Sequence, residues 1–515
     1  MELLDLPTEL LHKILVYTVL LRHVKRSLRL RLVCKLFSHA VKPALFESRL
    51  LDRFHTMNSG HNITGLRFDN RHTAEEFWHS YLVYRVRNET DPTVAHYVDI
   101  RQTAEAVCRE MGADLLPTID TVCWLALEHS LSCRNRRHYW EPRDPRPGDC
   151  AGSNPGDNLL STAAYFNLIP LAKQLLLEGH CPTSRGASPT DDDRLFPPPM
   201  QLAALAGNTE MLELFQQHIP ENEELPTKYG SNWHGKIAAC SLIGAVRRAD
   251  MEILKLALYP PSRSTPNSTD LQGQPFGHVD PSSSVGRMMI AARYRARSPE
   301  VHAYLLECLG GEIKLQDLSD DLEKHAGAGN LTMVRYLLDM GVPMTTPRGY
   351  EGCRGLTSAL VAACYRCHED VVDLLLERGA DPNFGYEKPV GMEVELTPLT
   401  IAAASGSLTI VRKLLDHGAH IDVPAEDYMT RLPALYWAIA IEHTAMVQLL
   451  LERGASLEGK KIEAALELAE ELDLDSMAEI LRGLGVTIKL RIKSVAPWLV
   501  WAVYPRPIGD GLRVY

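Results

Sequence analysis

The second half of the chain alternates apolar and polar positions with the period of an amphipathic helix. Val411, Leu414 and Leu415 lie at i, i+3 and i+4 and would form one apolar stripe on a helix. Three segments share this arrangement: LTSALVAACYRCHEDVVDLLLERGADPN from Leu356, LTPLTIAAASGSLTIVRKLLDHGAHID from Leu396 and LPALYWAIAIEHTAMVQLLLERGASLE from Leu432. Each has a small-residue helix, a short turn, a Leu-rich helix and a Gly-Ala pair. Because one such unit cannot bury its stripe alone, the pattern predicts a stack of helix pairs.

Residues at the helix ends support this prediction. Thr397 can cap the first helix of its unit, and Pro398 suits the first helical position because no N–H is needed there. The Gly-Ala pairs begin at Gly379, Gly418 and Gly454, where each second helix must stop in a left-handed conformation.

These units resemble the ankyrin repeat family. The family signature T-P-L-H-x-A reads Thr397-Pro398-Leu399-Thr400-Ile401-Ala402 here, with Thr400 in place of the histidine. Weaker copies extend upstream to LLSTAAYFNLIPLAKQLLLEGH and downstream to a unit from Lys460. The resemblance implies an α-solenoid of about nine units over residues 155–490. Two polar, Pro- and Ser-rich stretches, near 183–199 and 259–285, are expected to be long finger loops or disordered insertions.

The chain opens with a different helical pattern, MELLDLPTELLHKILVYTVLL. A first helix is expected from near Pro7, with Leu10, Leu11, Ile14 and Leu15 at helical spacing. A second helix would present Leu28, Leu32, Val33 and Phe37. About 50 residues are too few to bury so many aliphatic side chains. We therefore expect part of this surface to be covered by another chain or by the following region.

This opening segment resembles an F-box. The matches are Leu6-Pro7, Glu9, Ile14-Leu15, Leu28, Leu30, Leu32, Val33-Cys34-Lys35 and Phe37. The connection VYTVLLRHVKRS is longer than the turn usual in that family. The resemblance implies binding to a Skp-type adaptor, which would link the chain to a cullin–RING ubiquitin ligase. Residues implied to form or support the adaptor-binding surface are Leu6, Pro7, Leu10, Ile14, Leu15, Val33, Cys34 and Phe37.

The predicted fold is therefore all-α. Residues 1–50 form an F-box-like hairpin, 51–150 a helical connector, 155–490 the ankyrin array and 491–515 an aromatic C-terminal tail. The resemblances imply the substrate-recognition subunit of an SCF-type (Skp–cullin–F-box) ubiquitin ligase, with the repeats binding an unknown protein client. In the alternative, the N-terminal helices merely cap an ankyrin scaffold that has no ubiquitin role.

Composition narrows the functional classes. The formal net charge of −11 argues against general nucleic-acid binding, which requires a basic footprint. Acidic residues and Pro7 interrupt the opening apolar run, and no stretch reaches the roughly 18 apolar residues of a membrane span. Eleven scattered cysteines suit a reducing compartment. A cytoplasmic or nuclear location, without membrane association, is expected.

One motif suggests cofactor chemistry. Cys364-Tyr365-Arg366-Cys367-His368 matches the C-x-x-C-H pattern of heme attachment. Aligning the units instead places Cys367-His368 at the turn between two repeat helices, and only the distant Cys353 could help to complete a zinc site. The repeat interpretation is favoured. Because no catalytic motif was found either, we expect a non-enzymatic chain with no catalytic residue, metal ligand or cofactor.

Client binding is expected at the tips of the repeat loops, where such arrays present side chains to a partner. The candidates combine aromatic, Arg and other charged residues: Arg348, Tyr350, Tyr386, Lys388, Asp427, Tyr428 and Arg431. Ordinary exposed loop residues would look the same.

Overall fold

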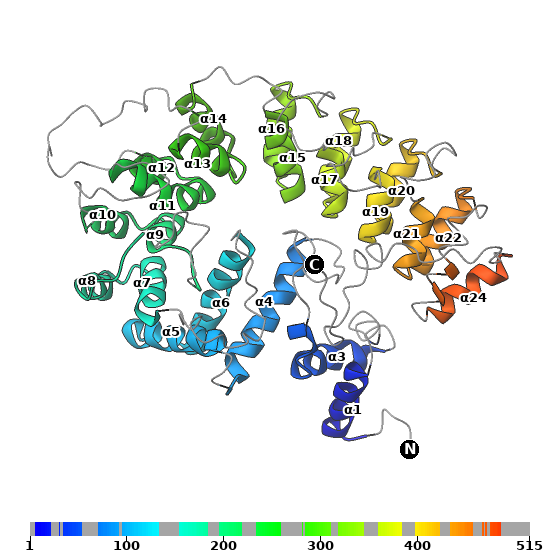
Figure 1. The fold of residues 1–515 in the computed structure, drawn as a ribbon, viewed down its shortest axis with the longest axis horizontal. Coiled ribbons are helices and arrows are strands. Elements are labelled where there is room, and N and C mark those ends of the chain that lie inside the picture. The colour runs from blue at the N-terminus through cyan, green and yellow to red at the C-terminus, as the bar shows by residue number, and fades with distance from the viewer. Residues whose placement is uncertain are drawn as a thin grey trace, which may run out of the picture.

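The structure is a computed structural model. It describes residues 6–21, 30, 34–53, 71–91, 95–132, 154–183, 195–218, 233–258, 281, 284–310, 318–344, 359–383, 397–422, 433–456, 466–467, 469–470 and 474–485. All regular elements in these ranges are helices, which confirms the all-α prediction. The helices follow one another around an open ring (Figure 1), from α4 (Arg71–Asn88) to α24 (Asp475–Gly483). Helices α1 (Thr8–Leu20) and α3 (Lys35–Glu47) lie beside its opening.

Three helices join the N-terminal pair to the array: α4, α5 (Ala95–Met111) and α6 (Leu115–Ser132). Large side chains fill the space between them, and Trp78, Tyr81 and Tyr97 are each at most 1% exposed. A short 3-10 helix, η3 (Leu50–Arg53), follows α3. The buried residues of the connector belong to the same apolar core as those of the first repeats, and α5 packs on α7, the first helix of the array.

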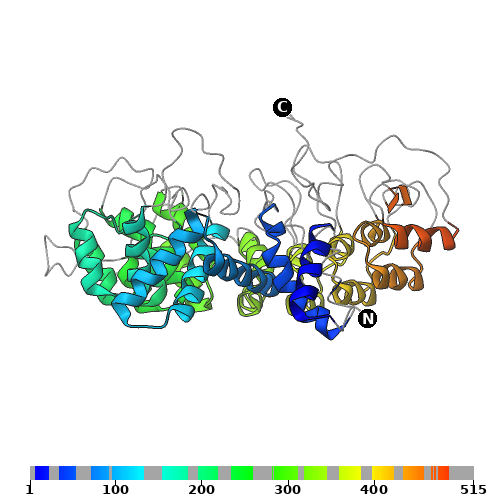
Figure 2. The same ribbon diagram turned by 90° about the horizontal axis from the view of Figure 1, so that it is seen from below.

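Helix pairs follow in the order the repeats predict. Within the described residues they are α7 (Pro155–Tyr165) with α8 (Ile169–Leu177), α9 (Pro199–Ala206) with α10 (Thr209–His218), α11 (Trp233–Arg248) with α12 (Met251–Leu258), α13 (Ser284–Arg293) with α14 (Pro299–Cys308), α15 (Ser319–Ala328) with α16 (Leu331–Asp339), α17 (Ala359–Tyr365) with α18 (Glu369–Glu377), α19 (Pro398–Ser405) with α20 (Leu408–Asp416), and α21 (Ala434–Ala440) with α22 (Thr444–Glu452). The first helices of successive pairs pack side by side, as in α15, α17 and α19. This stacking produces the solenoid, seen along its edge in Figure 2.

The caps of α19 form as the sequence indicates. The Thr397 hydroxyl accepts a hydrogen bond from the Thr400 N–H (3.2 Å), and the Thr400 hydroxyl accepts one from the Thr397 N–H (2.8 Å). Thr400 thus replaces the family's histidine with a capping box. Three glycines follow the second helices of their units, α18, α20 and α22. These residues, Gly379, Gly418 and Gly454, adopt φ values of 88°, 85° and 93°, a region in which any side chain would be strained.

The first predicted loop, residues 183–199, has buried residues at both of its ends. Thr183 is buried, and Leu195 and Phe196 are 4% and 0% exposed. Both ends of the segment 183–199 are therefore anchored in the core before α9 begins at Pro199. Residues 184–194, and most of the second loop, lie outside the described residues.

The array has two apolar cores, which meet at α13 to α16. One core extends from Val19 to Leu309 and the other from Leu318 to Leu481. A buried ionic cluster lies at their junction. The Asp321 Oδ2 atom is 2.7 Å from the Arg293 Nε atom and 2.7 Å from the His302 Nε2 atom, and all three side chains are at most 5% exposed. Opposite charges buried together satisfy one another only while all partners remain.

A second histidine, His325, packs beside this cluster and makes stability depend on pH. Burial, assisted by the neighbouring His302, lowers the pKa of His325 to about 4, against roughly 6.5 in an unfolded chain. Between these values only the unfolded chain binds the proton, so stability is complete above pH 6.5 and is lost as the pH falls. We expect the free energy of unfolding to drop by about 2 kcal/mol more between pH 7.5 and 5 than in a His325→Asn variant, measured by urea unfolding. Equal pH dependence of the two proteins would contradict this assignment.

Within the described part of the chain, no helix has both the length and the apolarity to cross a membrane.

Candidate protein-binding surfaces

Helices α1 and α3 pack against each other around a small apolar core. Its buried members are Leu11, Leu15, Phe37, Val41 and Ala44. A hydrogen bond ties the two helices together at their surface, with the His12 Nε2 atom 2.6 Å from the Glu47 Oε2 atom. Helix α1 begins at Thr8, directly after Pro7, as predicted, and Glu9 lies in its first turn. Negative charge at that position complements the helix dipole.

The opposite face of α1 is apolar and exposed. Leu10, Ile14, Tyr17 and Leu21 are 49%, 39%, 67% and 87% exposed, although leucine and isoleucine normally pack inside a protein. Their spacing of i, i+4, i+7 and i+11 places them on one side of α1. Leu21 is the C-cap of this helix and still has a helical backbone, so it continues the same side. We call these four residues the α1 stripe. Leu20 and Leu36 add exposed apolar surface at 44% and 42%.

The predicted adaptor-binding residues divide between the two faces of the hairpin. Pro7, Leu10 and Ile14 are exposed, while Leu6 and Cys34 are half-buried. Leu15 and Phe37 are 2% and 8% exposed and support the hairpin from inside. Val33 lies outside the described residues. The sequence predicted some residues that face the adaptor and others that support this surface from inside. Their exposure in the structure distinguishes these two groups among the described residues.

The second predicted helix was expected to present Leu28, Leu32, Val33 and Phe37. Phe37 lies on α3, which begins at Lys35 after the extended Cys34 (φ −161°, ψ 168°), so it does not share a helix with Val33. Leu28, Leu32 and Val33 lie outside the described residues, and their helical placement stays a prediction. The end of the first predicted helix needs correction. The first helix continues to Leu20, through residues that were assigned to the connection. Sequence analysis therefore missed Tyr17 and Leu21, although their spacing from Leu10 and Ile14 was the available signal.

Helix α3 is attached to the connector through aromatic packing. The Phe46 ring lies 5.5 Å from Phe77, 5.1 Å from Tyr81 and 5.7 Å from Tyr84 between ring centroids. Next to these rings, the buried Glu89 pairs with Arg85 and with Arg49. Burial raises the pKa of Glu89, but hydrogen bonds from Arg85 and from the backbone of Asp91, together with the charges of Arg85 and Arg49, outweigh it and lower the pKa overall. The hairpin is thus held by α3 and by the buried Val19 of α1, which belongs to the same core. The residues of the α1 stripe are not among the buried members of this core.

The C-x-x-C-H residues occupy a repeat turn, as the alignment predicted. Cys367 adopts φ 57°, in the turn where neighbouring units place Gly329 and Gly406 at 71° and 84°. His368 precedes α18, and its Nε2 atom lies 3.2 Å from the Gly327 carbonyl oxygen of the preceding unit. Cys364 is fully buried at the end of α17, and burial raises the pKa of its thiol. These side chains join neighbouring units.

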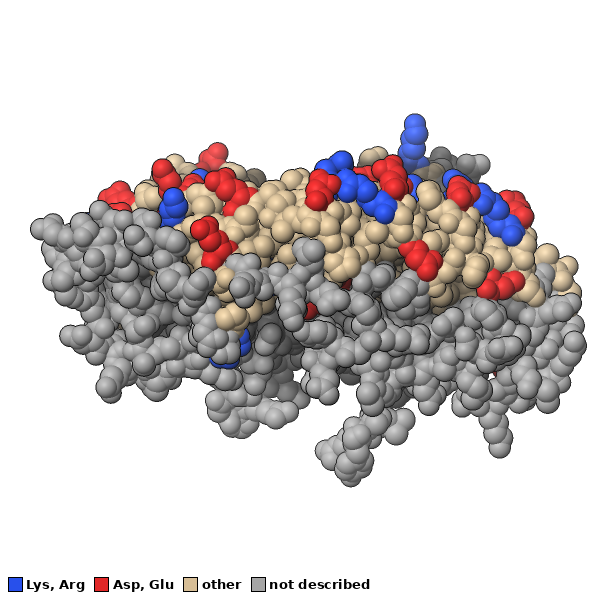
Figure 3. All heavy atoms as spheres, turned by 90° about the horizontal axis from the view of Figure 1, so that it is seen from above, with Lys and Arg blue, Asp and Glu red and all other residues tan. Residues whose placement is uncertain are grey.

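The outer face of the array carries paired charges. A cation of one unit meets a carboxylate of the preceding unit at Arg378–Asp339 (2.9 Å), Lys413–Asp373 (2.7 Å) and Arg453–Asp416 (2.8 Å). Figure 3 shows Lys and Arg beside Asp and Glu on the described part of the face seen from above. Exposed pairs of this kind contribute at most about 1 kcal/mol each, and they cancel one another's charge. The seven loop-tip candidates, Arg348 to Arg431, lie outside the described residues.

Comparison with known proteins identifies the repeats. The model for three copies of ankyrin repeats matches residues 385–461, and that for a single ankyrin repeat matches residues 356–385. Residues 356–461 therefore consist of ankyrin repeats, as predicted. Such repeats point to protein–protein interaction.

Several curated proteins are similar to parts of this chain. Ankyrin repeat and KH domain-containing protein mask of Drosophila melanogaster is 40% identical over 103 residues, which is 20% of this chain and 2% of that protein. Human SH3 and multiple ankyrin repeat domains protein 1 is 41% identical over 88 residues, or 17% and 4%. Human Ankyrin repeat and SOCS box protein 2 is 31% identical over 122 residues, or 23% and 17%. The chain thus spans less than a fifth of the length of each of these relatives.

Proposed function

We propose that this chain is a non-enzymatic substrate-recognition subunit of an SCF-type ubiquitin ligase in the cytoplasm or nucleus. Its α1–α3 hairpin would bind a Skp-type adaptor, and its ankyrin repeats would bind a protein client. The α1 stripe is the observation that supports this proposal best, because an exposed apolar face on a helix that is already packed on its other side is typical of a docking surface. The F-box resemblance of residues 1–50 supplies the identity of the adaptor.

The competing function is an ankyrin scaffold without a ubiquitin role, in which the N-terminal helices only cap the array. The contact of Phe46 with Phe77 and Tyr81 favours a capping role for α3. It does not account for α1, whose exposed residues Leu10, Ile14 and Tyr17 belong to no described core. The two functions therefore differ in what they require of the α1 stripe.

Co-purification tests the proposal directly. The full chain, expressed with an affinity tag together with a Skp-type adaptor, is expected to retain the adaptor through gel filtration in equimolar amount. The scaffold function instead predicts that the adaptor elutes separately, while deletion of residues 1–50 lowers the thermal stability of the repeats. An established F-box protein in the same assay serves as the positive control, and failure of this chain alone would refute the ligase role.

A further inference from the structure

The repeat helices are not packed equally closely along the whole array. First helices of neighbouring units pack side by side in α7 with α9, α9 with α11, α11 with α13, α15 with α17, α17 with α19, and α19 with α21. Among the described residues, α13 and α15 do not pack in this way. Figure 1 shows α13 and α14 apart from α15 and α16, across the ring from α1 and α3. We call helices α1 to α14 the first body and helices α15 to α24 the second body.

Helices within each body approach one another closely. Gly244 of α11 lies so near α9 that a Cβ atom on it would collide with the Gln201 carbonyl oxygen. In the second body, a Cβ atom on Gly327 of α15 would lie 3.5 Å from the Ala362 Cβ atom of α17, in van der Waals contact. Densely packed interiors are stiff, because any rotation of one helix against the next creates overlaps or voids. Each body is therefore expected to move as a unit.

The two bodies also have separate apolar cores. The core of the first body ends at Leu309, and that of the second body begins at Leu318. Leu306 of α14 is partly buried against the second core, whereas no described residue of the second body is among the apolar residues packed against the first core. Shared burial of apolar surface, the main force that holds packed elements together, therefore contributes little between α14 and α15.

Polar side chains make the connection between the bodies instead. The buried ionic cluster joins Arg293 of α13 and His302 of α14 to Asp321 of α15. Beside it, the Asn330 Nδ2 atom donates a 3.1 Å hydrogen bond to the Ala296 carbonyl oxygen. The Asp321 Oδ1 and His302 Nδ1 atoms are buried without a hydrogen-bond partner among the described residues. Such atoms gain hydrogen bonds when water reaches them, so a hydrated, open junction competes with the closed one.

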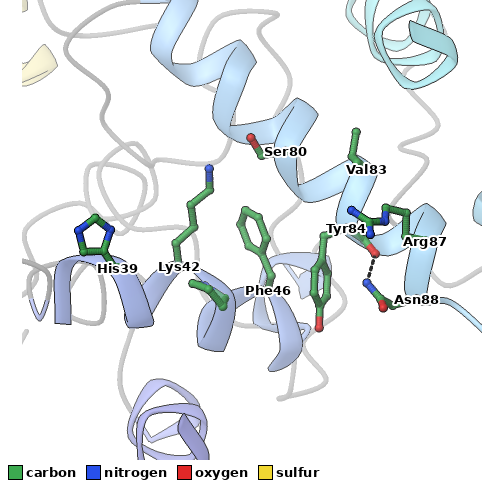
Figure 4. A pocket seen from close by; sticks show the side chains of 9 residues that line it. His39, Lys42, Phe46, Ser80, Val83, Tyr84, Arg87 and Asn88 are labelled. Carbon is green, nitrogen blue, oxygen red and sulfur yellow. Dashed lines mark hydrogen bonds between the residues drawn. The ribbon is translucent and has the colours of Figure 1, made fainter. Parts of the chain in front are cut away.

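The N-terminal hairpin is attached to the first body. Figure 4 shows Phe46 of α3 and Tyr84 of α4 between the two helices, and their ring centroids are 5.7 Å apart. Val19 of α1 and Phe46 both belong to the first core. The α1 stripe therefore belongs to one body, and the ankyrin helices α19 to α22 belong to the other.

We propose that the array is hinged between α14 and α15, and that the buried ionic cluster is the latch that closes this hinge. The two bodies rotate against each other when the cluster separates and its polar groups are hydrated. Because the hinge lies across the ring from α1 and α3, a small rotation changes the distance between the α1 stripe and helices α19 to α22. Proteins bound to these two surfaces are thus held at an adjustable separation. The hinge is a property of the chain alone and does not depend on the proposed ligase function.

Double electron–electron resonance on the full chain, without partners, tests the hinge. Spin labels on p-acetylphenylalanine avoid the cysteines of the chain. A pair at Lys255 of α12 and Glu377 of α18 spans the hinge. Lys173 with Lys255 lies within the first body and Glu377 with Gln448 within the second, and all four positions are exposed.

Asp321→Asn removes the anion of the latch and keeps the shape of the side chain. Arg293 then gains more from hydration than from the closed junction. The ratio of open to closed distances in the spanning pair is expected to rise at least about tenfold, which corresponds to about 1.4 kcal/mol. The two pairs within a body should keep their distances. An unchanged spanning pair would overturn the proposal, and so would broadening of all three pairs, because the region would then unfold and not pivot.

Asn330→Asp is a milder second variant. It keeps the side-chain oxygen that caps α16 but removes the N–H group that reaches the Ala296 carbonyl oxygen, and it should raise the same ratio about threefold. Asn208→Asp is the matched control, because Asn208 donates the equivalent hydrogen bonds to the Ala164 and Tyr165 carbonyl oxygens inside the first body. This control should leave the spanning pair unchanged. An equal shift in both variants would place flexibility throughout the array and overturn a hinge at this junction.

Discussion

Replacement of Ile14 by aspartate is expected to abolish adaptor capture while leaving the repeats folded. Ile14 lies in the α1 stripe between Leu10 and Tyr17, and 39% of its side chain is exposed. In a complex this position would be buried, so an aspartate there would lose apolar contact and place an unpaired carboxylate in the interface. Affinity should fall at least about 100-fold, which corresponds to roughly 3 kcal/mol.

The same substitution should affect the free chain little. An aspartate in a solvent-exposed helix interior costs only about 0.5 kcal/mol through helix propensity. Leu15, on the buried side of α1, remains in place. Circular dichroism and the thermal midpoint should therefore stay close to those of the unmodified chain.

Leu116→Asp provides the matched control. Leu116 is also an exposed leucine on a helix, 57% exposed near the start of α6, but it lies outside the hairpin. Adaptor capture, measured by biolayer interferometry on the full chain, should be unchanged in this variant. Full binding by Ile14→Asp, or equal loss in both variants, would contradict a docking role for the α1 stripe.

The repeat core could be predicted because its residues have local reasons for their identity. Gly379, Gly418 and Gly454 end helices, and Thr397 begins one, so each leaves a signal within a few positions of its element. The turn at Cys367 could be found only by aligning units, because a cysteine at positive φ has no composition signal of its own. Local capping residues and the helical spacing of apolar positions were therefore enough to predict the array.

The binding surfaces depend on contacts that no local pattern specifies. The α1 stripe was half predicted: Leu10 and Ile14 came from the F-box resemblance, whereas Tyr17 lies where that resemblance expects a connection. The ionic cluster was missed because the charged residues of α13 to α15 read as solvent-facing in an amphipathic pattern.

Removal of the Asp321 carboxylate is expected to be the most destabilising single change in the array. Asp321→Ala would leave Arg293 and His302, which are 4% and 0% exposed, buried without their anion. Breaking a buried pair in this way costs about 3–5 kcal/mol. Because the cluster lies where the two apolar cores meet, the loss should be largest in α13 to α16. Hydrogen exchange with mass spectrometry should show faster exchange there than in α19 to α22.

A triple variant distinguishes stranded charge from lost packing. Arg293→Met/His302→Leu/Asp321→Leu removes all three polar partners, and replacing a complete buried network by apolar residues is often neutral or stabilising. Its protection in α13 to α16 should therefore recover toward that of the unmodified chain. If the triple variant exchanged as fast as Asp321→Ala, the cluster would matter through its shape and not through its charges. Recovery would instead show that the charge left buried without its partner, and not lost packing, destabilises the junction in Asp321→Ala.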